Sequence, residues 1–202
     1  MSVAFSARHN AIMCSVKKGY RLATGLGLLG LVLIGSVEAE ESFSENEVKA
    51  VFLYNFANFV SWPKESRQES SKEFRYCVLD EDMAPILRKV LKDETVQGRP
   101  LKVQQENIDA DLAECHVLYL GKSSFGGGRG WQLARAALAA HVLTVSDLES
   151  FEAHGGMVAL VRQDRRVHPR INLDAVEKSA LRVSAKLLNL ATVVRDTTAV
   201  GD

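Results

Sequence analysis

The run CHVLYLG, residues 115–121, decides the fold together with FRYCVLD at residues 74–80. Both stretches are apolar, contain β-branched and aromatic side chains, and are preceded and followed by charged residues. Each therefore predicts a buried strand. Two such strands belong near the centre of a sheet, so the flanking segments must supply the helices that cover it.

Helix and strand patterns alternate on both sides of these two runs. Ser44 and Glu47 form an S-x-x-E capping box ahead of apolar residues at three- and four-residue spacing, which predicts an amphipathic helix ending at Trp62-Pro63. Residues 173–191 have a similar periodicity and predict one long final helix. The other predicted elements are a short helix capped by Asp82 and running through Lys92, a strand at 101–105, a helix at 131–140, a strand at 141–145, a short helix ending at 154–156, and a hairpin of strands 157–162 and 167–172.

This order predicts a single layered α/β domain over residues 40–202. Its central sheet is mixed and partly parallel, helices flank the sheet, and long helices stand at the N- and C-termini. Pro169 places the hairpin near a sheet edge, because proline donates no hydrogen bond to a neighbouring strand.

The first 39 residues have the order of a secretory signal peptide. Residues 22–35 are apolar and uncharged, and Val37-Glu38-Ala39 places small residues at −3 and −1 of a cleavage point before Glu40. The apolar run is shorter than the roughly 20 residues of a spanning helix, so a retained signal anchor is the alternative. We expect export to the periplasm with cleavage near Ala39-Glu40, from a start at Met1 or Met13. The basic residues ahead of the apolar run are Arg8, Lys17, Lys18 and Arg21.

Removal of the leader leaves two cysteines, Cys77 and Cys115, one in each central strand run. An even count in a compartment that permits disulfides favours a bond between them. Two strands of one sheet can bring their Cα atoms to the separation of about 4.4–6.8 Å that a disulfide needs. The alternative is a pair of buried free thiols that pack as small hydrophobic side chains.

Composition and motifs argue against nucleic-acid binding and catalysis. Residues 40–202 carry 21 Lys and Arg against 24 Asp and Glu, without the basic excess of an electrostatic nucleic-acid binder. Gly121-Lys122-Ser123 is no phosphate loop, because His116 occupies the place of its upstream glycine. The histidines lack metal-ligand spacing, and Cys77 lacks a C-x-x-C partner. We therefore expect no enzyme, no cofactor and no metal.

Two groups of side chains are candidates for contact with a partner or ligand. The first predicted helix is aromatic around most of its circumference, and most of these rings belong in the core. Tyr54 and Trp62 are expected to reach the surface. Basic charge gathers on the hairpin and the last helix, either as a solvated face or as a site for an anionic ligand or an acidic partner surface. This group comprises Arg165, Arg166, Arg170 and Arg182.

Several segments together resemble the YfiR family of exported regulators, in order and spacing, from about Glu45 to Val193. They are EVKAVFLYNFANFVSWP, the strand that contains Cys77, CHVLYLG, HVLTVSD, the GGM opening of a strand, the IN before the last helix, and LRVSAKLLNLA.

The resemblance implies a periplasmic, non-enzymatic repressor that binds the periplasmic domain of an inner-membrane diguanylate cyclase and holds it inactive. Cyclic-di-GMP and biofilm formation would stay low until an outer-membrane lipoprotein sequesters the repressor. It also implies a homodimer and a disulfide between Cys77 and Cys115. Some family members carry a second cysteine pair around the GGM strand and a histidine near the C-terminus. Val158 and Ser184 stand in those segments here, so neither feature is implied.

The leading hypothesis is therefore a regulator that acts by binding a membrane signalling enzyme. The alternative is a periplasmic small-ligand binding protein that feeds a sensor kinase or a transporter. That alternative needs a concave pocket lined by arginine and aromatic side chains.

Overall fold

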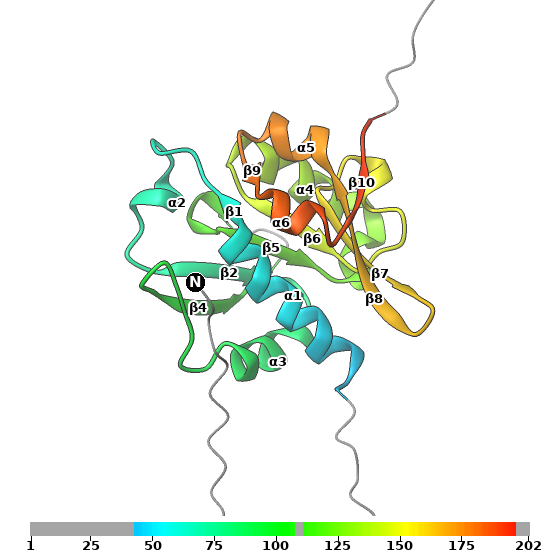
Figure 1. Cartoon of the computed structure of the whole chain (residues 1–202), viewed down its shortest axis with the longest axis horizontal. Coiled ribbons are helices and arrows are strands. Elements are labelled where there is room, and N and C mark those ends of the chain that lie inside the picture. The colour runs from blue at the N-terminus through cyan, green and yellow to red at the C-terminus, as the bar shows by residue number, and fades with distance from the viewer. Residues whose placement is uncertain (1–42, 108–110, 197–202) are drawn as a thin grey trace, which may run out of the picture. The chain divides into compact units, whose positions relative to one another are not determined.

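The structure, a computed structural model, describes residues 43–107 and 111–196. The predicted signal peptide at 1–39 lies outside the described residues. The described part is an α/β domain with a mixed sheet between layers of helices (Figure 1), so the predicted fold class is confirmed.

The main sheet has eight strands in the order β10-β8-β7-β6-β5-β2-β4-β3. β4, β2, β5, β6 and β7 run parallel to one another, whereas β8 is antiparallel to β7 and β3 is antiparallel to β4. β10 pairs in parallel with β8. The strands are β2 Phe74–Val78, β3 Thr95–Val96, β4 Arg99–Gln105, β5 Val117–Leu120, β6 Leu143–Ser146, β7 Val158–Gln163, β8 Arg166–Asn172 and β10 Thr192–Val194.

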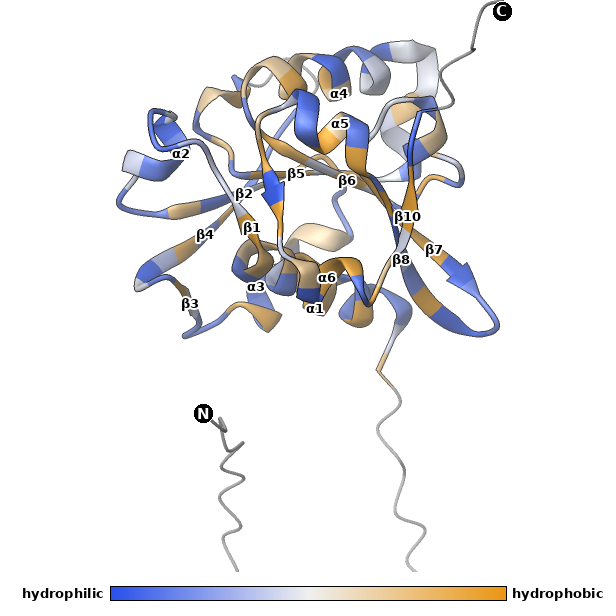
Figure 2. Cartoon of the chain, turned by 45° about the horizontal axis from the view of Figure 1, so that its top comes forward, coloured by the Kyte–Doolittle hydropathy of each residue, from blue (hydrophilic) through white to orange (hydrophobic). Residues whose placement is uncertain are grey.

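Helices cover both faces of this sheet (Figure 2): α1, α3 and α6 lie on one side and α4 lies on the other. Successive residues of the central strands point to opposite sides, so Tyr76 packs in the α1 layer and Cys77 in the α4 layer. Both faces of the parallel strands are therefore buried. The helices are α1 Glu45–Phe59, α2 Arg67–Ser70, α3 Met83–Val90, α4 Arg129–Ala139, α5 Leu173–Lys178 and α6 Ala185–Leu188, with short 3-10 helices at Leu112–Glu114, Lys122–Gly128 and Glu152–His154.

The start of α1 follows the predicted capping box. Ser44 Oγ accepts a hydrogen bond from the Glu47 amide at 3.2 Å, and the Glu47 carboxylate accepts one from the Ser44 amide at 2.9 Å. At α3 the predicted cap is wrong, because the Met83 amide donates to Asp80 at 2.8 Å. Asp82 already has helical backbone angles and makes no capping bond.

The predicted long final helix is wrong: the segment forms α5, β9 (Arg182–Val183), α6 and β10. The chain leaves α5 through Ala180, which has a φ of 56°, and Val183 then pairs with Val60 of β1 (Val60–Ser61). The Ser184 hydroxyl caps α6. Leu181 and Leu187 are both buried, which accounts for the apolar periodicity of the sequence. The chain between α5 and α6, residues 179–184, is nevertheless not helical.

The predicted hairpin is present as β7 and β8, but it does not form the sheet edge along its whole length. β10 pairs with Arg170, Ile171 and Asn172, so that half of β8 is internal. Pro169 pairs with Leu160 of β7 and lies immediately before the pairing with β10 begins, so β10 does not need its missing amide hydrogen. The half of the hairpin nearer its turn extends beyond the sheet.

Candidate functional site

In an open α/β sheet, ligands usually bind at the carboxyl ends of the strands, at the switch point where the strand order reverses. In this protein, side chains occupy that place. Here the switch point lies between β2 and β5. The Asp80 carboxylate packs directly against Gly121, since a Cβ added to Gly121 would overlap Asp80 Oδ2. Lys49 of α1 is buried near the adjacent strand end, with its ammonium 2.9 Å from Asp147 and 2.8 Å from Glu45. The candidate binding site therefore lies elsewhere on the domain.

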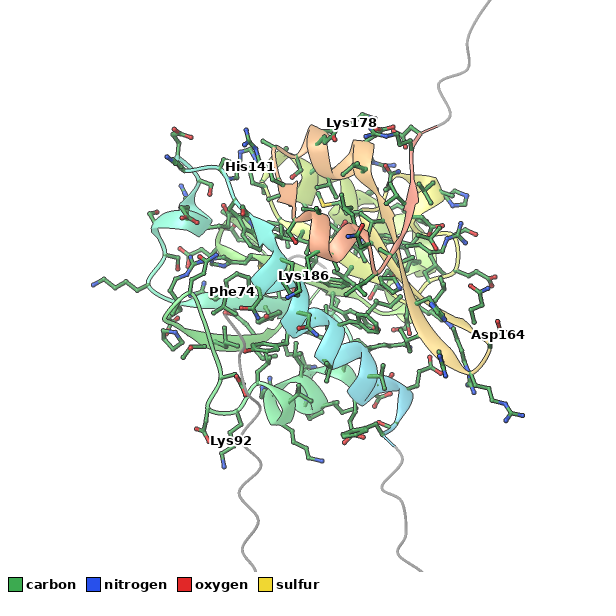
Figure 3. The ribbon with its side chains drawn as sticks, viewed as in Figure 1. Phe74, Lys92, His141, Asp164, Lys178 and Lys186 are labelled. Carbon is green, nitrogen blue, oxygen red and sulfur yellow. A yellow bond between two sulfur atoms is a disulfide. The ribbon has the colours of Figure 1, made fainter. Side chains whose placement is uncertain are left out.

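A groove of about 490 Å³ lies between the start of α1 and the β7–β8 hairpin. Figure 1 shows this end of α1 beside the hairpin, and Asp164 marks the hairpin tip in Figure 3. We call it the arginine groove. Its lining residues are Phe43, Glu45, Val48, Phe52, Arg162, Arg165, Arg166 and Val167.

The hairpin turn places the arginines of this groove. Asp164 and Arg165 have φ angles of 47° and 64°, as a two-residue type I′ turn requires. Gln163 then pairs with Arg166, and Arg162 pairs with Val167. Arg162 and Val167 form a cross-strand pair that lines the groove, and Arg166 lines it from the first position of β8, next to the turn.

The groove keeps an excess of positive charge. Arg162 Nη1 contacts Glu45 Oε2 at 3.2 Å. Glu45 also accepts a hydrogen bond from Lys49, and this bond is the main cause that lowers the pKa of Glu45. Arg165 and Arg166 are exposed and form no ion pair with any residue in 43–107 or 111–196. Two guanidinium groups are therefore free to bind an anionic group.

The four arginines predicted from the sequence do not form one site. Arg165 and Arg166 line the groove, whereas Arg170 Nη2 contacts the fully buried Glu152 carboxylate at 3.0 Å. Arg182 is exposed on β9 in the separate two-stranded sheet. Arg162 was missed, although pairing the two strands across the tight QDRR turn would have placed it opposite Val167.

The predicted exposure of Trp62 is wrong, because its side chain is 6% exposed. Its ring packs edge-on against Phe74, with centroids 5.2 Å apart, and against His116 at 5.7 Å. Tyr54 is partly exposed, and its hydroxyl donates to a Glu94 carboxylate oxygen at 2.9 Å. Neither side chain lines the arginine groove.

A disulfide joins Cys77 of β2 to Cys115, two residues ahead of β5, with a Cα–Cα distance of 5.8 Å. Both cysteines are buried. The bond links neighbouring parallel strands in the α4 layer and lies apart from the groove. It is a structural element of the fold.

Two other features are absent from residues 43–107 and 111–196, a metal-binding cluster and a membrane-spanning helix. No group of three or more His, Cys, Asp or Glu side chains there is arranged to hold a metal ion. Among the helices of these same residues, none has the length and apolarity to cross a membrane.

No curated protein matches the chain. A solved structure, described as a conserved domain protein from Vibrio cholerae O1 biovar El Tor strain N16961, is similar in fold with a TM-score of 0.51 and 12% sequence identity. The similarity covers 74% of this chain and 60% of that chain.

The YfiR/HmsC-like family matches residues 46–192. This range includes α1 except its first residue, all strands of the main sheet except the last two residues of β10, and the disulfide. The chain therefore belongs to the YfiR/HmsC-like family, a family of periplasmic regulators.

Proposed function

We propose that the protein is a periplasmic regulator that binds the periplasmic domain of an inner-membrane diguanylate cyclase and holds the enzyme inactive. Membership of the YfiR/HmsC-like family over residues 46–192 carries this proposal. Cyclic-di-GMP and biofilm formation are lowered as a consequence. Residues 1–39 act as a signal peptide that is cleaved near Ala39-Glu40.

The physical requirement is a difference in affinity for two states of the cyclase. A regulator shifts an equilibrium only when it binds one state more tightly than the other. The folded domain offers a disulfide-linked sheet and a positively charged groove at its surface. Docking of such a surface on the inactive state of the cyclase domain would lower the active population without any chemical step.

Two further partners belong to this proposal. An outer-membrane lipoprotein competes for the regulator and so releases the cyclase. The regulator acts as a homodimer.

The proposal is tested by deleting the gene and measuring cyclic-di-GMP by mass spectrometry. We expect the nucleotide level and surface attachment to rise, and to return to normal when the gene is supplied on a plasmid. A matched strain that also lacks the cognate cyclase should show no rise. Unchanged cyclic-di-GMP in the single deletion would contradict the proposal.

A small-ligand binding protein is the second candidate, favoured by one observation. The groove volume of about 490 Å³ lies within the range of about 300–1,000 Å³ that small-molecule pockets occupy. Thermal-shift screening of the exported protein against carboxylates, amino acids, nucleotides and vitamins tests this candidate. A large rise in melting temperature with one compound would favour it.

A further inference from the structure

We propose that the arginine groove binds an acidic segment of the partner protein that also carries a large apolar side chain. The inference rests on the proposed function, since it assigns the docking surface and the chemistry that this surface recognises. Three arginines and several apolar side chains line one concave surface. The arginines select the acidic groups of such a segment, and the apolar side chains select its large apolar side chain.

The charge of the groove selects carboxylates. Arg165 and Arg166 form no ion pair with a described residue, and Arg162 shares Glu45 with Lys49. A guanidinium group offers parallel N–H donors that match the two oxygens of a carboxylate. The carboxylates of an acidic segment would therefore pair with the guanidinium groups of Arg165 and Arg166.

The floor of the groove selects an apolar side chain beside those carboxylates. The apolar lining consists of Val48 and Phe52 of α1, Val167 of β8, and Phe43, which is 76% exposed. A free inorganic anion would leave this surface in water. A Phe, Tyr, Leu or Trp side chain would bury it, as the central anchors of protein interfaces do.

The mixture of charges disfavours an anionic membrane as the occupant. Membrane-binding patches usually contain roughly four to eight clustered basic side chains. Here three arginines stand near two carboxylates, Glu45 in the groove and Asp164 at the hairpin tip. A protein segment with its own charge pattern fits this arrangement better than a uniform lipid surface does.

The test measures binding of the exported protein to the purified periplasmic domain of the cognate cyclase by calorimetry. We expect R165E/R166E to raise Kd at least about tenfold at low salt, with a smaller effect at high salt, because the contacts are between charges. The matched control is R88E/R135E, which reverses two exposed helical arginines that form no ion pair with a described residue. The control should leave Kd unchanged.

A second variant tests the apolar part of the surface. F43S removes a side chain that is already 76% exposed, so the fold and melting temperature should be unchanged. We expect weaker binding with an unchanged salt dependence. Overlapping peptides from the cyclase domain should bind the wild-type protein only where acidic and large apolar residues occur together.

The outcomes separate the inference from the proposed function. If the wild-type protein binds and inhibits the cyclase and R165E/R166E does so equally well, the inference is overturned and the proposed function stands. If the wild-type protein does not bind the cyclase domain, the proposed function fails. Binding of phosphatidylglycerol vesicles or of free glutamate that depends on Arg165 and Arg166, without peptide binding, would also overturn the inference.

Discussion

His116 is a buried histidine whose hydrogen bonds define its protonation state. Its Nδ1 accepts from the Arg75 amide at 3.1 Å, so Nε2 carries the hydrogen and donates to the Gln68 carbonyl at 2.8 Å. The ring packs against Phe74 and Trp62. Burial disfavours the charged imidazolium and lowers the pKa of His116 to about 4.

This pKa predicts a stability that depends on pH. The neutral ring contributes fully above the unfolded pKa of about 6.5, and its contribution is lost as pH falls from about 6.5 to about 4, by roughly 3 kcal/mol in total. Urea titrations across this range should show a steeper loss of unfolding free energy for the wild type than for H116Q. H154Q, which changes an exposed histidine, should retain the wild-type slope. Parallel curves for the wild type and H116Q would refute this assignment.

A second prediction concerns the buried Glu152 carboxylate, which pairs with Arg170. Arg170→Met leaves that carboxylate without a partner and should cost about 3–5 kcal/mol of unfolding free energy. The double variant R170M/E152Q should recover part of the loss, because the buried charge is then absent. Arg182→Met, at an exposed arginine, should change stability by less than about 0.5 kcal/mol. A similar effect of both arginine substitutions would show that Arg170 has no structural role.

Among the elements, the short helix α2 connects parts of the chain that are distant in sequence. The buried Gln68 side-chain amide donates to the carbonyls of Ala113, Cys115 and Ala140. Its backbone carbonyl accepts from Arg99 and His116. No local pattern in residues 64–72 predicts this role, because nothing in the neighbouring sequence marks a glutamine that bonds to carbonyls far along the chain.

Gln68→Met should therefore destabilise the domain by about 1–3 kcal/mol, because buried carbonyls lose their donors. Hydrogen exchange or limited proteolysis should show earlier opening of residues 63–72 than in the wild type. Gln132→Met, at an exposed position of α4, serves as the control and should be close to neutral. An unaltered protease pattern for Gln68→Met would contradict the anchoring role.

At the scale of the whole molecule, the disulfide links β2 to the segment that enters β5, across 38 positions of sequence. Between these two cysteines the chain forms α3, β3 and β4 and then returns to the centre of the sheet. The bond therefore closes a loop that contains α3, β3 and β4, and it reduces the conformational entropy of the unfolded chain.

Replacing both cysteines by serine should lower the free energy of unfolding by about 3–4 kcal/mol, as the chain-entropy model gives for a loop of this size. Calorimetry should show the same direction of change when the wild-type protein is fully reduced. Peptide mapping without reductant should recover Cys77 and Cys115 in one linked fragment. Free thiols in the exported protein would contradict the bond.

The sequence by itself determined the alternation of the main helices and strands from α1 to β8, the capped start of α1, the two central strands and the hairpin. These features depend on local periodicity, on caps and on turn residues, which are interactions between residues close in the chain. Only the tertiary structure decided that Trp62 is buried, that Arg170 pairs with Glu152, and that the final helix breaks where Val183 pairs with Val60.

The same distinction applies to the candidate site. The sequence identified Arg165 and Arg166, whereas the strand pairing added Arg162 and the packing of α1 supplied Val48 and Phe52 as the floor. A groove between a helix and a hairpin more than 100 residues apart depends on long-range contacts. Local sequence patterns do not contain those contacts, because they arise only when the whole sheet assembles.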